Sequence, residues 1–203
     1  MAPAPPSQGS LAKKELVREV RLQGALLGAM VGAMWAEELV DQFVFHGRLN
    51  SFGIHPREPR GLLGILTAPF LHANFAHLAA NSIPLLVLGL FVMARRKRDL
   101  GYVFALSALV AGVGTWVFGG GGTVHLGAST VVFGFLGYLL ALGVFERSFW
   151  TIAGSVVVFF LYGGALWGVL PGVPGISWEG HLFGLLGGVL AARVLARRSV
   201  RRS

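Results

Sequence analysis

The stretch LGASTVVFGFLGYLLALGVF, residues 126–145, contains no charged side chain at any of its positions. A helix needs about 20 mostly apolar residues to cross the hydrocarbon core of a bilayer. The segment that follows it, residues 148–170, is equally free of charge. These two segments predict a pair of membrane-spanning helices, and a helical membrane protein is therefore the first interpretation of the chain.

The composition of the whole chain agrees with a membrane protein. Of its 203 residues 54% are hydrophobic and 13% are charged, whereas soluble domains carry about 25% charged residues. The mean hydropathy is +0.68. The sequence has no cysteine, which excludes disulfides, a thiolate nucleophile and a cysteine-bound metal.

Six hydrophobic segments are long enough to span a membrane, so the predicted fold class is an all-α membrane protein built as a six-helix bundle. The predicted spans cover residues 22–43, 75–94, 100–118, 126–145, 149–170 and 178–196. We expect residues 1–12 to form a disordered tail, residues 13–198 one membrane domain, and residues 199–203 a basic tail. The connection 44–74 is long and half apolar, and we expect it to fold on the outer leaflet or partly into it.

The basic residues are unevenly divided between the two sides of this predicted bundle. All of the 17 lysines and arginines except Arg48, Arg57 and Arg60 fall on the side that holds both ends of the chain. Cytoplasmic loops are enriched in Lys and Arg, so both termini are predicted to be cytoplasmic. Topology thus explains the net charge of +8, and we expect the lipid bilayer rather than a nucleic acid as a partner.

Four polar residues stand out because hydrogen-bonding groups inside a bilayer are costly and often functional. His77 and Asn81 lie near the start of the second span, four residues apart and on one helix face. Ser129 opens the fourth span, and His181 opens the sixth. The second, fourth and sixth spans run in the same direction, which predicts a similar shallow depth for all four residues. This coincidence favours one shared site.

Each of these residues also has an ordinary structural interpretation. A serine inside a membrane helix often donates to a carbonyl one turn earlier, a single histidine at a helix start often lies at the membrane interface, and Asn81 can join two helices. A metal site is disfavoured because the HExxH spacing does not occur. A small transporter is a third class, but the two halves show no inverted repeat with broken helices.

Three motifs together resemble the rhomboid family of intramembrane serine proteases. The first is the spacing of His72, His77 and Asn81, the second is the segment GAST that begins at Gly127, and the third is GHLFGLLGG, residues 180–188. They occur in the order that the family has them, on the second, fourth and sixth spans. The resemblance covers about residues 60–196 and implies a six-helix core.

The resemblance implies a role for each motif residue. Ser129 is expected to be the nucleophile and His181 the general base, without a third acidic member. His77, Asn81 and the backbone N–H of Ser129 are expected to stabilise the oxyanion. Supporting roles are expected for His72, Gly127, Phe133 and Gly184. The implied substrates are transmembrane proteins cleaved near the outer leaflet, and neither a metal nor another cofactor is implied.

Thr130 departs from the family pattern, which usually has glycine at this position. A β-branched residue is stiff and cannot easily take a positive φ. The alternative is therefore a catalytically inactive relative that binds membrane helices without cutting them. The compact core predicts a multi-pass protein of a prokaryotic inner membrane, and these residues identify neither the substrate nor the oligomeric state.

Overall fold

The computed structural model describes residues 8–95 and 99–200, and the elements within these residues are helical. The long elements are α1 (Gln8–Val40), α3 (Phe75–Arg95), α4 (Asp99–Phe118), α5 (Ser129–Glu146), α6 (Phe149–Tyr162) with its continuation η4 (Gly163–Val169), and α7 (Trp178–Val200). Short elements lie between α1 and α3, namely η1 (Asp41–Phe45), η2 (Arg48–Phe52), α2 (Gly61–Thr67) and η3 (Ala68–Phe70).

In the described part of the chain, five helices are long and apolar enough to cross a membrane. They are Phe75–Arg95, Asp99–Phe118, Ser129–Glu146, Phe149–Val169 and Trp178–Arg197, which match the last five predicted spans. The first predicted span, 22–43, falls in α1 and in the π-helical turn η1 after it. This helix is not among the five, because glycines and the acidic Glu37 and Glu38 make it less apolar than the others.

Both ends of the described chain are more helical than expected. Helix α1 begins at Gln8, so residues 8–12 of the expected disordered tail are helical, and residues 1–7 lie outside the described residues. Helix α7 extends to Val200, so the first two residues of the expected basic tail are helical as well. The remainder of that tail, residues 201–203, lies outside the described residues.

Two span boundaries also differ from the prediction. The fourth span begins at Ser129 and not at residue 126, because Gly127 has a φ of +121°, which a right-handed helix does not contain. The fifth span is not one regular helix, since the α-helical geometry ends at Tyr162 and a 3₁₀-helix extends it to Val169. The predicted span over residues 149–170 is confirmed in length, but its last third is a 3₁₀-helix and not an α-helix.

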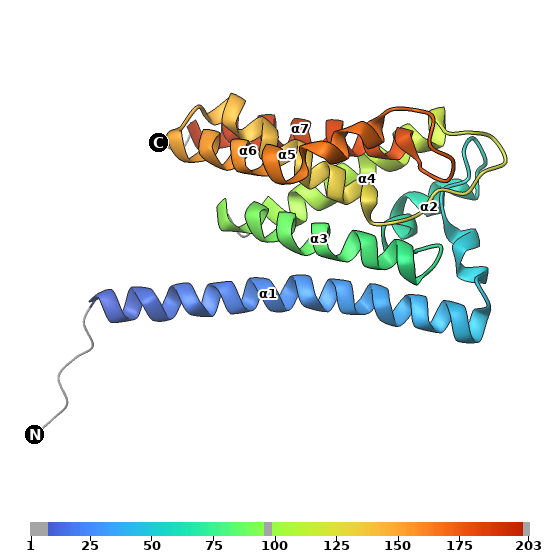
Figure 1. The fold of residues 1–203 in the computed structure, drawn as a ribbon, viewed down its shortest axis with the longest axis horizontal. Coiled ribbons are helices and arrows are strands. Elements are labelled where there is room, and N and C mark those ends of the chain that lie inside the picture. The colour runs from blue at the N-terminus through green and yellow to red at the C-terminus, as the bar shows by residue number, and fades with distance from the viewer. Residues whose placement is uncertain (1–7, 96–98, 201–203) are drawn as a thin grey trace, which may run out of the picture.

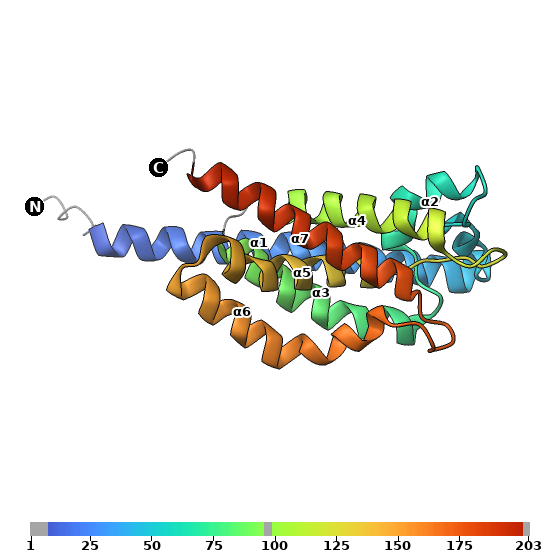
Figure 2. The same cartoon turned by 90° about the horizontal axis from the view of Figure 1, so that it is seen from above.

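Helix α5 lies at the centre of the bundle and packs against α7, α6, α3 and α4 (Figures 1 and 2). Helix α1 lies along one edge beside α3, and α6, the least buried of the five spans, lies at the periphery. The most extensive contact joins α5 to α7. Glycines allow it, since a Cβ on Gly184 would overlap the carbonyl oxygen of Thr130, and a Cβ on Gly188 that of Gly134.

Helices α3, α5 and α7 all start at the same end of the bundle, which we call the site end (Figure 1). The start of α1 and the end of α7 lie at the opposite end, which we call the far end. The connection 44–74 folds into the short elements at the site end, and it is joined there to the loop before α5. Ile54 and His125 exchange two backbone hydrogen bonds, of 2.8 and 3.0 Å. The connection 44–74 and the loop before α5 are therefore joined into one layer at the site end.

Candidate active site

Ser129 is the first residue of α5, and the backbone before it is held from two sides. The N–H of Gly127 donates to the carbonyl of Ala68 at 2.8 Å, and the N–H of Ala128 donates to Nε2 of His72 at 3.3 Å. Glycine adopts the positive φ of residue 127 at little cost. Ser129 is in the first turn of α5, where N–H groups have no acceptor within the helix. Its N–H therefore lies at the positive end of the α5 dipole.

His181 lies on α7 and is fixed by a ring contact and a hydrogen bond. The ring of Phe133, one turn after Ser129 on α5, stacks on the His181 ring with a centroid distance of 4.1 Å and an angle of 9°. Nδ1 of His181 lies 3.0 Å from the carbonyl oxygen of Gly168. A carbonyl only accepts, so Nδ1 carries the proton, and in the neutral ring Nε2 is the free acceptor.

Thr130, the residue that departs from the family pattern, fits into a regular helix. The described non-glycine residues with positive φ are His46, Arg57 and Arg147, so Thr130 needs no conformation that only glycine accepts easily. The methyl group of Thr130 lies 3.0 Å from the point that a Cβ on Gly180 would occupy. The absence of a side chain at residue 180 on α7 therefore leaves room for the larger side chain on α5.

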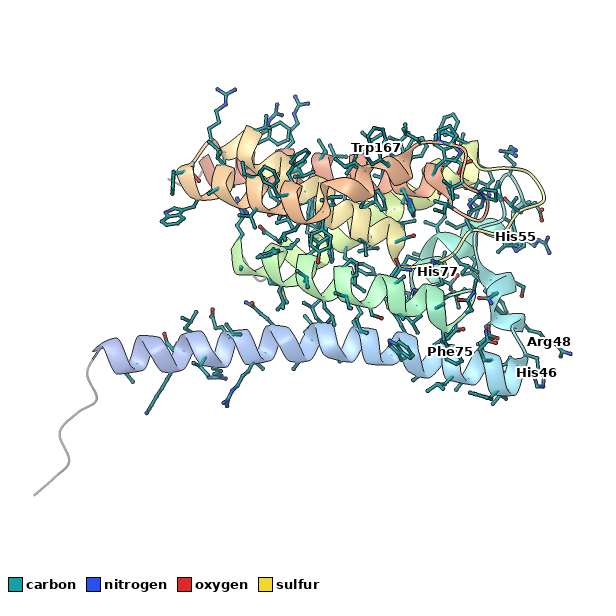
Figure 3. The ribbon with its side chains drawn as sticks, in the orientation of Figure 1. His46, Arg48, His55, Phe75, His77 and Trp167 are labelled. Atoms are coloured by element: carbon teal, nitrogen blue, oxygen red, sulfur yellow. The ribbon has the colours of Figure 1, made fainter. Side chains whose placement is uncertain are left out.

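His77 and Ser129 both lie close to Gly127. A Cβ on Gly127 would lie 2.9 Å from Nε2 of His77 and 3.7 Å from Oγ of Ser129. Figure 3 shows His77 close to the start of α3, at the site end. Asn81, one turn further along α3, donates from Nδ2 to the His77 carbonyl at 2.9 Å. Its amide has two N–H groups, so this bond uses only one of them.

His72 is fully buried in the segment before α3. Its pKa is lowered to about 4, mainly by burial and also by the nearby His77 ring, while the Phe70 carbonyl acts in the opposite direction. The ring is therefore neutral near pH 7, as it must be for Nε2 to accept the N–H of Ala128. The His72 and His77 rings lie edge to face, with centroids 5.3 Å apart. His72 thus supports both the loop before Ser129 and the His77 ring.

The structure brings the predicted site residues together at the site end of α3, α5 and α7, but one expected contact is missing. Ser129, Gly127 and His77 are neighbours, and Phe133 links α5 to His181. Within the described residues, no hydrogen bond joins Oγ of Ser129 to His181. Such bonds are often long without substrate and shorten in the reacting complex. The arrangement offers a hydroxyl, a neutral imidazole acceptor and hydrogen-bond donors around one loop.

The sequence interpretation missed the polar residues on the other side of Ser129. Thr115, His125 and Ser177 line a small cavity together with Ser129 and Thr130. His125 lies two residues before Gly127, where the GAST segment begins, so its place in the sequence was a signal. Ser177 gave a second one, since a serine just before a helix is a common N-cap. Within the described residues, no group of three His, Asp or Glu side chains is arranged to hold a metal ion.

Comparisons with known proteins identify the family to which the chain is similar. The Rhomboid domain family matches residues 59–198. An uncharacterized protein of Mycobacterium tuberculosis is 41% identical over 181 residues, which are 85% of this chain and 75% of that protein. One of Mycobacterium leprae is 40% identical, over 85% of this chain and 71% of that protein. A Bacillus subtilis protein named "Putative rhomboid protease YdcA" is 31% identical over 141 residues, 68% of this chain and 69% of that protein.

The family match covers more than half of the chain, and the chain aligns with about 70% or more of the length of these bacterial relatives. The predicted resemblance is thus confirmed at the level of the family. With its five apolar helices, this multi-pass membrane protein belongs to the Rhomboid domain family.

Proposed function

We propose that this protein is an intramembrane serine endopeptidase that cleaves transmembrane proteins with Ser129 and His181. The single observation that carries the proposal is the state of the His181 ring. Its Nδ1 is committed to the Gly168 carbonyl, and its face is packed on Phe133 of the helix that Ser129 begins. A neutral imidazole held in this way has Nε2 free to take the proton of a nearby hydroxyl.

In the proposed reaction, Oγ of Ser129 attacks the carbonyl carbon of the scissile peptide bond as its proton passes to Nε2 of His181. The oxyanion that forms is stabilised by the N–H of Ser129, the His77 ring and the second N–H of Asn81. His181 then gives its proton to the leaving amine as the C–N bond breaks. Water hydrolyses the acyl enzyme by the same steps in reverse order, and the Ser129 hydroxyl is restored.

The proposal includes the orientation in the membrane. Both termini lie in the cytoplasm and the site end lies near the outer leaflet, which is supported by the excess of Lys and Arg toward the far end. Substrate helices would therefore be cut near the outer face, where water can reach the site. The alternative, an inactive relative that only binds membrane helices, predicts no cleavage by any variant.

The test is cleavage of a model transmembrane substrate by the full chain in proteoliposomes. Ser129→Ala and His181→Ala are each expected to reduce kcat by about 1,000-fold or more, because nucleophile and base act as one unit. The matched control is Ser107→Ala, which removes a buried hydroxyl of α4 that has no hydrogen-bond partner in the described structure. Cleavage that survives Ser129→Ala, or that is absent from the unaltered protein, contradicts the proposal.

A further inference from the structure

His125 lies in the loop between α4 and α5 and is hydrogen-bonded on both sides of its ring. Nδ1 lies 2.7 Å from Oγ of Ser177, which directly precedes α7. Nε2 lies 2.7 Å from Oγ1 of Thr123 in its own loop. The bond to Ser177 connects the loop that leads to Ser129 with the segment that leads to His181, across 52 residues of sequence.

The partners of His125 determine which of its nitrogens carries the proton. The Thr123 hydroxyl donates its hydrogen to the Gly120 carbonyl at 2.6 Å, so toward His125 it can only accept, and Nε2 must donate. Burial lowers the pKa of His125, with Glu179 acting in the opposite direction, which favours the neutral ring. In the neutral ring Nδ1 is then an acceptor, so the hydroxyl of Ser177 donates to it.

Ser177 in turn holds the first turn of α7. Its Oγ accepts the N–H of Gly180 at 3.3 Å, and its carbonyl accepts the N–H of His181 itself at 3.1 Å. A serine in this position satisfies N–H groups that a helix start leaves without partners. The hydrogen bond from Ser177 to His125 fixes the direction of the Ser177 side chain. The His125 ring is therefore connected to the backbone N–H of His181 through a single residue, Ser177.

The backbone of His125 is also anchored on the opposite side. It exchanges hydrogen bonds of 2.8 and 3.0 Å with Ile54, and Gly127, two residues further on, donates to Ala68. The chain then enters α5 at Ser129. His125 is therefore the residue at which the connection 44–74, the loop before Ser129 and the start of α7 meet.

We propose that His125 is a positioning residue, which sets the distance between Ser129 and His181 by holding the N-cap Ser177 of α7 against the loop before α5. The inference rests on the proposed function of Ser129 and His181, and it adds a residue that touches neither the substrate nor the reacting atoms. A misplacement of about 1 Å in a catalytic pair can lower a rate by about 100-fold, so loss of this link acts on kcat.

Two substitutions of His125 separate its two bonds. In His125→Asn, Oδ1 takes the place of Nδ1 and can still accept from Ser177. In His125→Gln, Nε2 keeps the donor to Thr123, but the acceptor for Ser177 is lost. Ser177→Ala removes the same bond from the other side. The control is His55→Asn, because His55 is a buried histidine of the site end that bonds to the Ser51 carbonyl and makes no hydrogen bond to α7 in the described structure (Figure 3).

The measurement is kcat and KM for cleavage of the model transmembrane substrate, with folding checked by thermal unfolding. We expect His125→Gln and Ser177→Ala to lower kcat about tenfold with KM changed less than about twofold, and His125→Asn to retain kcat within about threefold. The double variant His125→Gln/Ser177→Ala should have a kcat no lower than that of the less active single variant, because both changes remove the same hydrogen bond. Unchanged kcat in His125→Gln and Ser177→Ala overturns the inference while the proposed function stands.

Nitrogen-15 NMR of the histidine rings in the unaltered protein gives a readout that needs neither activity nor a variant. We expect His125 to carry its proton on Nε2 and to accept at Nδ1, and the His181 signals to shift in Ser177→Ala. A proton on Nδ1 of neutral His125 overturns the inference. If no Ser129-dependent cleavage occurs at all, the proposed function fails, and the ring signals alone then decide whether His125 holds the start of α7.

Discussion

Helices α3 and α5 carry polar side chains at both of their ends, and the two ends use them differently. At the far end, Arg95 of α3 forms ion pairs with Asp99 of α4 and Glu146 of α5. Tyr138 of α5 adds a hydrogen bond of 2.7 Å from its hydroxyl to Asp99. At the site end the same two helices carry neutral groups, mainly His77 and Ser129. Hydrogen bonds from backbone N–H groups hold the loop before Ser129 in place.

The comparison shows that polar groups in this bundle have two separate tasks. Charges at the far end pair with one another, as buried charges must to be tolerated, and they fasten α3, α4 and α5 together. The neutral groups at the site end keep donors and acceptors available, because their positions are set by glycines and backbone hydrogen bonds. Substitutions at the two ends should therefore separate activity from stability.

Outside Ser129 and His181 themselves, the largest loss of activity is expected from Gly127→Ala. A Cβ there would lie 2.7 Å from Cε1 of His77, and the positive φ adds strain, so we expect kcat to fall about 100-fold through misplaced groups. The control is Gly172→Ala, which has a φ of +125° but no atom within 4 Å of the new Cβ. Both variants should lose about 1–2 kcal/mol of stability. Equal kcat losses in both would mean that strain, not contact with His77, is responsible.

A smaller loss is expected where α5 and α7 touch. In Gly184→Ala the methyl group meets the Thr130 carbonyl oxygen, which should move α7 away from α5 and lower kcat about tenfold by shifting His181. Gly154→Ala on α6 is the control, because nothing lies within 4 Å of its new Cβ. Cleavage kinetics in proteoliposomes check both. A fully active Gly184→Ala protein would show that the close contact is not needed for the site.

At the far end, Asp99→Asn should change stability much more than activity. The substitution leaves Arg95 without one of its anionic partners. We expect the free energy of unfolding to fall by about 3 kcal/mol, measured by thermal or denaturant unfolding. The exposed pair of Arg60 and Glu58 is the control, and Arg60→Gln should cost less than about 1 kcal/mol. We expect kcat of the folded Asp99→Asn protein to stay within about threefold. A greater loss of kcat would break the separation between the two ends.

The smallest effect is expected from Thr130→Gly, which restores the usual family residue. Thr130 lies in a regular helix against Gly180, so glycine gains no needed conformation and costs about 0.5 kcal/mol in helix propensity. Cleavage should change by less than about twofold. A large increase in kcat would mean that the methyl group obstructs the site, and Thr130 would then mark a weakened enzyme.

The helical spans followed directly from the sequence, because apolar length is a local property. Five of the six predicted spans are apolar helices of sufficient length, and the starts of three of them place the predicted residues at one end. The break after Tyr162 was missed because the residues that follow, GGALWGV, are as apolar as a helix. The helical start at Gln8 was missed because polar residues before the first span were interpreted as a tail.

The site was predictable in part. Ser129, His77 and His181 were found from their depth and from the family resemblance, and their roles remain predictions. The link from His125 to Ser177 joins residues 52 positions apart through two loops, and no periodicity records such a contact. The ion pairs of Arg95 were missed for a related reason, because its charge was used only as a sign of membrane orientation.

The central claim is that the Ser129 hydroxyl is activated by His181. The most direct measurement is labelling of the full chain in membranes by a fluorophosphonate probe, with the modified residue identified by mass spectrometry. We expect the probe on Ser129, no labelling of Ser129→Ala, and labelling slowed by about 100-fold or more in His181→Ala. An unlabelled protein, or equally fast labelling of Ser129 in His181→Ala, would contradict the claim.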